Sequence, residues 1–213
     1  MIQIKTLEVR GFKPAIIGMR NPMNSWDKSD SSYTFPDGEF VLGPEDKKLM
    51  MKLRNAGTDH RKFMRMITVY ADITAPLYWW KEYDTYKVGT VANSCSTMHK
   101  IHAKEFTIDD FSHEHLLEQD EKALNYIVDY LNINRRSYLD TKDKTYWWQM
   151  IQLLPSSYNQ KRTVMMNYEV LANIYKSRKN HKLDEWRDFC KWIETLPYGE
   201  LITGEDNGDT VQG

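Results

Sequence analysis

The chain has 213 residues, a formal net charge of −1 and only two cysteines, Cys95 and Cys190. This length favours one domain with a sizeable core, and the balanced charge offers no basic excess for a nucleic-acid partner. Two cysteines exclude a disulfide framework and a cysteine-built metal site, and no apolar run approaches the roughly 18 residues of a membrane span, so we expect a soluble, cytoplasmic protein without a membrane partner.

The N-terminal part of the chain alternates strand and helix patterns. Apolar residues alternate over residues 2–9, which predicts an opening strand. Residues 18–38 are rich in Asn, Ser, Asp, Pro and Gly and predict a long loop, of a length typical of functional segments. A helix is predicted over residues 44–53, because proline and two acidic residues suit a first helical turn. Alternation over residues 66–74 predicts a second strand.

The stretch from Ala75 to Thr97 reads APLYWWKEYDTYKVGTVANSCST. It predicts a short aromatic helix that begins after a proline and leads into a polar loop of small residues. The loop carries hydroxyl, amide and thiol groups close together, with His99 and Lys100 directly behind it. Such groups on a loop between rigid elements suit an anionic small ligand, so this segment is the first candidate site.

The rest of the chain is predicted to be helical, over residues 116–131, 144–154, 167–179 and 183–196. The tail from Gly204 has almost nothing to bury and is predicted to be disordered. Strands followed by helices predict an α+β fold, in which a sheet is flanked by helices and the C-terminal half is helical. We expect one domain over residues 1–203.

The segment from Ala75 resembles the signature region of the flavin-dependent thymidylate synthases. The family pattern is Ala-Pro, a Gln-Trp pair, then Arg-His-Arg-x-x-Ser-x-Asn-Glu-x-Ser-x-Arg. In a gapless register, the positions from Gln-Trp onward are occupied here by Glu82, Tyr83, Thr85, Tyr86, Lys87, Thr90, Ala92, Asn93, Cys95 and Thr97. None is identical to the motif residue, and Lys87 and Thr90 are the closest substitutes. The family's Leu-Pro…Asn…Leu-x-Asn…Arg segment is matched at Leu154, Pro155, Asn167, Leu171, Asn173 and Arg178.

This resemblance covers roughly residues 45–190 and implies reductive methylation of dUMP to dTMP. It implies methylenetetrahydrofolate as the carbon donor, FAD as the hydride carrier, NADPH as the reductant, and a homotetramer. The implied cofactor-binding residues are His60, Thr85, Lys87, Thr90, Asn93, Asn167 and Asn173. The implied substrate-binding residues are Glu82, Ser94, Cys95, Ser96, Thr97 and Arg178, of which Cys95 and Arg178 are also the catalytic candidates.

Two of the family's phosphate-binding arginines are replaced, by Thr97 and by Ile151. The neighbouring cations that could compensate are His99, Lys100, Lys161 and Arg162. These losses leave two alternatives open: a flavoprotein that modifies another pyrimidine nucleotide, and a non-catalytic nucleotide-binding homologue.

Cys95 and the tryptophan pairs each have two interpretations. A thiolate beside His99 and Lys100 could be reactive, but we favour Cys95 as a small replacement for the family serine. The Trp79-Trp80 and Trp147-Trp148 pairs could stack on a flavin or folate ring. We favour packing in the core or an oligomer for both pairs, because adjacent helical residues point in different directions.

Overall fold

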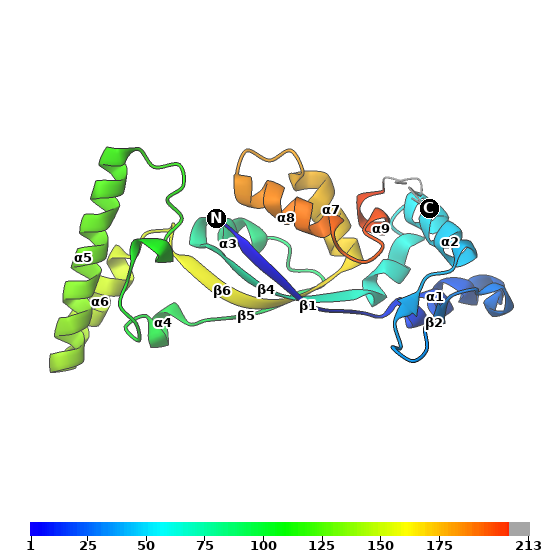
Figure 1. Cartoon of the computed structure of the whole chain (residues 1–213), viewed down its shortest axis with the longest axis horizontal. Helices are drawn as coiled ribbons and strands as arrows, with labels where there is room; N and C mark the ends of the chain where they lie inside the picture. The colour runs from blue at the N-terminus through cyan, green and yellow to red at the C-terminus, as the bar shows by residue number, and fades with distance from the viewer. Residues whose placement is uncertain (205–213) are drawn as a thin grey trace. The chain divides into compact units, whose positions relative to one another are not determined.

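The computed structural model describes residues 1–204 and has an α+β architecture. Four strands form one sheet in the order β1-β4-β6-β5, with β1 at Gln3–Arg10, β4 at Thr68–Pro76, β6 at Asn159–Asn167 and β5 at Thr90–Ser94 (Figure 1). In β4, alternate residues Val69, Ala71, Ile73 and Ala75 are fully buried, as the period of the sequence predicts. None of the helices in the described part of the chain is long and apolar enough to cross a membrane.

Contacts divide the chain into two compact units, and every strand of the sheet contributes residues to both. Unit 1 comprises Met1–Ile4, Asp72–Thr85 and Ala92–Thr163. Unit 2 comprises Lys5–Ala71, Tyr86–Val91 and the chain from Val164 onward. The expectation of a single domain therefore stays a prediction.

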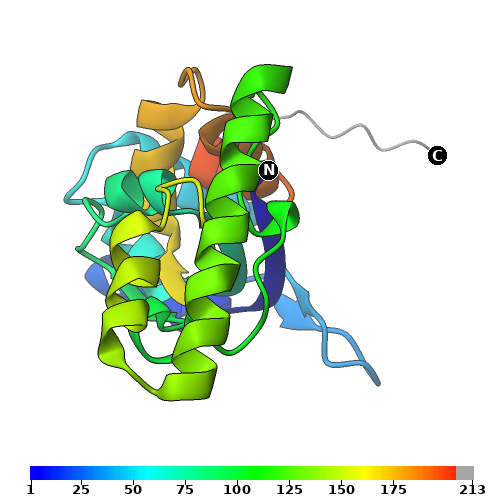
Figure 2. The same ribbon diagram turned by 90° about the vertical axis from the view of Figure 1, so that its left-hand side faces the viewer.

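Unit 1 contains a hairpin of two helices, α5 (Glu118–Thr141) and α6 (Lys144–Leu153), which lie side by side (Figure 2). Leu124, Val128 and Leu131 lie at helical spacing on α5 and pack on Met150 of α6. Phe106 completes this core from the segment before α5, and its backbone N–H and C=O both bond to the buried amide of Asn132, at 2.9 and 2.8 Å. The hairpin therefore fixes the chain that follows the short helix α4 (Thr97–Lys100).

Helix α3 (Leu77–Tyr83) supplies the second buried cluster of unit 1. Trp79 and Trp80 are at most 1% exposed and pack edge to face, with ring centroids 4.8 Å apart. Trp80 Nε1 donates to the carbonyl of Gln160 in β6, at 2.9 Å. The favoured packing of this pair in the core is confirmed, so neither ring is available to stack on a ligand. Trp148 of the second pair is half exposed.

Unit 2 packs helices α1 (Phe12–Arg20), α2 (Pro44–Asn55), α7 (Tyr168–Arg178), α8 (Asp184–Glu194) and α9 (Glu200–Thr203) with the 3-10 helix η3 (Arg61–Met66). A small antiparallel pair of strands, β2 (Ser32–Tyr33) and β3 (Phe40–Val41), joins α1 to α2. The buried faces of α7 and α8 are built from apolar side chains such as Leu171, Ile174, Trp186 and Phe189.

A buried ion pair ties α1 to α2. Arg20 is 4% exposed and Asp46 is fully buried, with Arg20 Nη2 2.6 Å from Asp46 Oδ1. The hydroxyls of Ser29 and Ser31 each donate to the other oxygen of Asp46, at 2.7 Å. Asp30 accepts the backbone N–H groups of Glu45 and Asp46 at the start of α2. The segment before β2 is thus fastened to the N-terminus of α2.

Most predicted elements are confirmed, and four differ from the prediction. Helix α5 runs to Thr141 and does not end at residue 131. The predicted loop over residues 18–38 is wrong at its start, because α1 runs to Arg20, and two 3-10 turns and β2 follow. The predicted polar loop after α3 contains β5 and α4. The sequence does not predict strand β6. Val164 and Met166 are buried as in other strands, but the buried residue Gln160 is polar, so the alternation of apolar residues is broken. The tail predicted to be disordered lies, beyond Gly204, outside the described residues.

Candidate functional site

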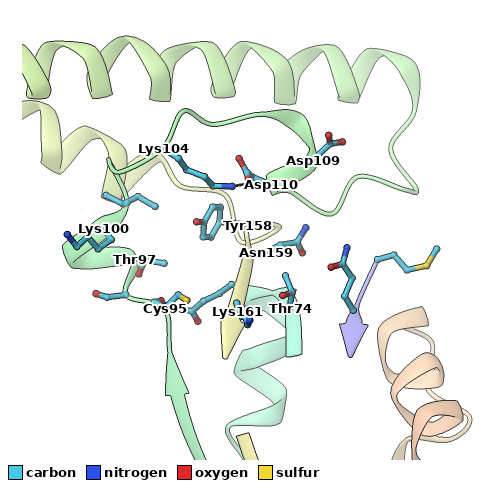
Figure 3. A pocket seen from close by; sticks show the side chains of 15 residues that line it. Thr74, Cys95, Thr97, Lys100, Lys104, Asp109, Asp110, Tyr158, Asn159 and Lys161 are labelled. Atoms are coloured by element: carbon cyan, nitrogen blue, oxygen red, sulfur yellow. Dashed lines mark hydrogen bonds and ion pairs between the residues drawn. The ribbon is translucent and has the colours of Figure 1, made fainter. Parts of the chain in front are cut away.

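A cavity of about 380 Å³ lies in unit 1, beside the C-terminal end of β5 and the start of β6 (Figure 3). Three of the predicted substrate-binding residues, Cys95, Ser96 and Thr97, line it. Tyr158 and Asn159 contribute to the opposite wall. The volume lies in the range of small-molecule sites.

The backbone of the predicted substrate loop is fixed by β6. Cys95 donates its N–H to the carbonyl of Lys161 at 2.9 Å, and its own carbonyl accepts from Gln160 Nε2 at 2.8 Å. Ser96 then caps the next helical turn, because its hydroxyl accepts the N–H of His99 at 3.0 Å. These bonds leave the thiol of Cys95 exposed at the cavity. Strand pairing therefore positions a thiol and hydroxyls at the cavity wall.

Three lysines line the cavity: Lys100, Lys104 and Lys161. Lys161 Nζ lies 2.7 Å from Asp72 Oδ2, and the hydrogen bond and negative charge of Asp72 raise the pKa of Lys161. Lys104 is paired with Asp110, which also lines the cavity. Within the described residues, Lys100 makes no side-chain hydrogen bond or ion pair. The cavity is therefore rimmed by positive charge that an anionic ligand could use.

Two of the four cations that the sequence singled out as replacements do not line this cavity. Arg162 is held elsewhere, because Nη1 lies 2.8 Å from Asp84 Oδ1 and the guanidinium lies 4.2 Å over the ring of Trp80. His99 is the second. Lys104, in contrast, was missed by the sequence reasoning, since it matches no motif position. Its only signal was its place four residues after Lys100, in the segment that follows the predicted loop.

The other predicted residues of unit 1 lie outside this cavity. Asn93 and Ser94 are exposed on β5. Thr85 donates its hydroxyl to the carbonyl of Glu82 at 2.7 Å, just after the last turn of α3. Their predicted roles in binding cofactor or substrate stay predictions.

Most predicted cofactor-binding residues lie in unit 2. His60 lines a second, larger cavity of about 820 Å³, whose walls include apolar side chains of α1, α2 and η3 such as Met19, Leu49 and Phe63. Lys62 and Arg65 also line it. Asp59 lines it as well, so the cavity combines apolar walls with a few charged groups, as small-molecule sites commonly do.

Two predicted cofactor-binding asparagines lie at α7 and have different partners in unit 2. Asn167 is the residue before the helix, and Asn173 lies within it. Asn173 Oδ1 accepts from Arg61 Nη2 at 2.9 Å, and Arg61 and Arg65 both pair with Glu169. Asn167 instead caps α7 by accepting the N–H of Val170 at 2.9 Å. The amide of Asn167 lies against Gly89, where any Cβ would come within 2.4 Å of it and φ is +81°. Position 89 therefore requires glycine.

Arg178 lies at the end of α7 between two aromatic rings. Its Nε donates to the hydroxyl of Tyr86 at 2.9 Å, and its guanidinium lies 4.8 Å over the ring of Trp186. Thr90 Oγ1 donates to the carbonyl of Tyr86 at 2.6 Å, in the turn that also contains Lys87. The arginine is thus oriented by stacking and a hydrogen bond, unlike a solvated charge at a helix end.

No group of three His, Cys, Asp or Glu side chains in residues 1–204 is placed to hold a metal ion.

We expect alkylation to distinguish the two cysteines of the native protein. Cys190 is buried, and burial together with Glu194 raises the pKa of its thiol to about 12. It should stay unmodified by iodoacetamide at neutral pH, whereas the exposed Cys95 should react. Peptide mass spectrometry measures both sites in one sample, so Cys190 is an internal control. Equal modification of Cys95 and Cys190 in the folded protein would contradict this difference in accessibility.

Comparison with solved structures places this chain among proteins of one fold. It superposes on thymidylate synthase X (ThyX) from Helicobacter pylori with FAD and dUMP, with a TM-score of 0.69 and 18% identity over 97% of this chain and 98% of that one. A second H. pylori ThyX structure with FAD and dUMP gives 0.67 and 19% over 96% and 98%. The UMP/dUMP methylase PolB from Streptomyces cacaoi, bound with 5-Br UMP, gives 0.61 and 12% over 92% and 88%.

No family model and no curated protein sequence matches the chain. The similarity therefore rests on the fold, and the chain has the ThyX fold that the sequence resemblance predicts.

Proposed function

We propose that this protein is a flavin-dependent enzyme that methylates the base of a pyrimidine nucleotide, converting dUMP to dTMP. The proposal includes methylenetetrahydrofolate as the carbon donor and NADPH as the reductant of FAD. One observation carries it: residues 95–97, which fall on the last positions of the family motif, line a cavity in the size range of small-molecule sites, in a chain with the ThyX fold.

The residues of unit 2 fit a flavin. The larger cavity offers apolar walls for a planar ring, while His60, Lys62 and Arg65 offer donors for an anionic tail. Lys87, Thr90, Asn167 and Asn173 are the further residues that we assign to the cofactor. Reduced FAD would supply the hydride. The chain's own share is to hold the cofactor, to exclude water from it and to hold the nucleotide.

The residues of unit 1 fit the nucleotide. Ser96 and Thr97 offer hydroxyl donors, and the three lysines offer charge for a phosphate. Tyr158 lines the cavity with a phenol that can donate at neutral pH, and burial and the negative charge of Asp110 raise its pKa further from neutrality. We assign Cys95 to the same wall as a small neighbour of the base, with its thiol in the place of a serine hydroxyl. Neither Arg178 nor Glu82 lines this cavity, and we propose them as further nucleotide contacts on the motif resemblance alone.

A second pyrimidine nucleotide is the alternative substrate. The PolB structure of the same fold is described as a UMP/dUMP methylase, and the replacement of two motif arginines by Thr97 and Ile151 favours a changed substrate. Turnover of UMP would support this alternative over dUMP. The proposed homotetramer, which light scattering measures directly, is common to both.

Flavin binding tests the proposal at its first step. The full-length protein is mixed with FAD and freed of excess by gel filtration, after which its absorption spectrum is recorded. We expect a bound flavin band that NADPH bleaches without oxygen, faster when dUMP is present. The His60→Ala variant should retain less flavin, and Lys176→Ala, at an exposed residue of α7, should retain as much as the wild type. A colourless protein would leave only the fold in common with ThyX.

A further inference from the structure

We propose that lysines held by the protein's own carboxylates form the phosphate subsite of the unit 1 cavity. In the structure, Lys104 is paired with Asp110, and Lys161 is paired with Asp72. When the ligand binds, both lysines leave these carboxylates and, together with Lys100, bind its phosphate. This inference rests on the proposed nucleotide substrate but not on flavin chemistry. It assigns roles to Lys104, Asp110 and Asp72, none of which occupies a position of the family motif.

The two ion pairs are asymmetric. The side chains of Lys104 and Lys161 are 70% and 51% exposed, whereas those of Asp110 and Asp72 are only 12% and 21% exposed. Each lysine is therefore a long, solvated side chain that can turn, and each carboxylate is set into the fold. Exposed ion pairs of this kind contribute little to stability, so exchanging the partner of the lysine costs little.

Each carboxylate also has a second anchor that does not depend on its lysine. Asp110 Oδ2 accepts the N–H of Thr107 at 2.9 Å, in the capping box of the turn η4 (Ile108–Asp110). Asp72 Oδ1 accepts the hydroxyl of Thr163 at 2.6 Å, from the neighbouring strand β6. Both carboxylates therefore stay in place and remain hydrogen-bonded when the lysines leave.

Figure 3 shows the amino group of Lys104 directed toward Asp110 on one side of Tyr158, with Lys161 on the other side. The three lysines outnumber the carboxylates that line the cavity, Asp109 and Asp110. Asp72, which pairs with Lys161 but does not line the cavity, balances the third lysine. Each lysine that turns from its carboxylate to a ligand therefore brings positive charge to a phosphate monoester, whose charge is about −1.5 to −2 at neutral pH. A monophosphate therefore has more to gain here than a neutral nucleoside.

The same reasoning explains how the cavity dispenses with arginine. An ammonium group is a compact point charge on a flexible stem, so several lysines can converge on one phosphate without the fixed geometry of a guanidinium fork. We therefore expect an affinity for phosphate that is strongly dependent on salt concentration.

The test uses two substitutions with opposite expected effects on one ion pair. Lys104→Ala removes a phosphate ligand and should weaken dUMP binding roughly tenfold. Asp110→Asn keeps an acceptor for Thr107 but releases Lys104, so dUMP binding should become tighter, by roughly threefold. Isothermal titration calorimetry on the full-length protein, without flavin, measures both. Lys122→Ala is the matched control, because Lys122 is also an exposed lysine paired with a carboxylate, on α5, and does not line the cavity.

Deoxyuridine and inorganic phosphate identify the part of the ligand that is bound. Affinity for deoxyuridine should be equal in all variants, and inorganic phosphate should compete with dUMP in the wild type but less in Lys104→Ala. Equal dUMP affinity in Lys104→Ala and wild type, or no binding of dUMP and phosphate at all, would overturn the subsite. Thermal unfolding verifies that each variant is folded, and Lys161→Ala repeats the test at the second pair. A protein that binds dUMP through these lysines but never binds flavin would retain the subsite and refute the proposed function.

Discussion

Replacing Arg178 by alanine should lower kcat/KM for dUMP by about 100-fold. The expected loss follows from one bidentate contact between Arg178 and an anionic ligand. Each charge-assisted hydrogen bond contributes about 1.5–3 kcal/mol, and about 1.4 kcal/mol corresponds to a tenfold change in rate. In the structure, the hydroxyl of Tyr86 and the ring of Trp186 orient the guanidinium, and its role in binding the nucleotide is the prediction that this variant tests. Steady-state kinetics with varied dUMP measures the effect.

Three further variants separate binding geometry from charge. Arg178→Lys keeps the charge but loses the fork, so its kcat/KM should fall between the wild type and alanine. Tyr86→Phe removes one orienting hydrogen bond and should cost less than the loss of the arginine. Lys176→Ala changes the charge of the same helix at an exposed position and should leave kcat/KM unchanged. Wild-type turnover by Arg178→Ala would show that Arg178 is only a charge at the end of α7.

Replacing Asp46 by alanine should lower the free energy of unfolding by about 3–5 kcal/mol, the usual cost of leaving one member of a buried ion pair without its partner. Arg20 would remain buried at 4% exposure, and Ser29 and Ser31 would lose their shared acceptor. Chemical denaturation measures the change. The double variant Arg20→Met with Asp46→Ala should lose less than the sum of the two single variants, because it leaves no buried charge unpaired. Additive losses would contradict the importance of the pair.

The same carboxylate predicts how stability depends on pH. Burial would raise the pKa of Asp46, but hydrogen bonds from Ser31, Ser29 and Arg20 outweigh burial, and the net pKa is lowered. A lowered native pKa stabilises the fold above the unfolded value of about 3.9, and this contribution is lost as the pH falls through the native pKa. The stability difference between wild type and Asp46→Ala should therefore be constant near neutral pH and shrink below about pH 4.

The sequence predicts those elements whose pattern is periodic and apolar. Strand β4 alternates without interruption, and α5 carries its buried leucines at helical spacing, so both were found. The sequence does not predict helix α1, because Pro14 and Gly18 interrupt its pattern. Its buried apolar residues nevertheless repeat at helical spacing: Phe12, Ala15, Ile16 and Met19. Strand β5 is mostly exposed and offers no apolar alternation, and it forms because it pairs with β6.

The sequence predicts the part of the candidate site that is formed by consecutive residues. It does not predict the part that is formed by segments distant in the sequence. Residues 95–97 are adjacent in the motif and do line one cavity. Lys161 reaches the same cavity because β6 pairs with β5, and Tyr158, which precedes β6, forms a bridge to Phe111. No local pattern in the sequence gives either pairing. Lys104 is placed there by the segment that Asn132 fixes from α5. The sequence names Lys100 and Lys161 as possible replacements for the arginines, and the folded chain adds Lys104 and brings all three lysines to one cavity.

Product analysis tests the account most directly. The full-length protein is incubated with FAD, NADPH, methylenetetrahydrofolate and dUMP, and the nucleotides are separated and identified by mass spectrometry. The account predicts dTMP, one methylene heavier than dUMP, and none when the flavin is omitted. Recovery of unchanged dUMP, and of unchanged UMP from a parallel incubation with UMP in its place, by a folded protein that holds both flavin and nucleotide would contradict it.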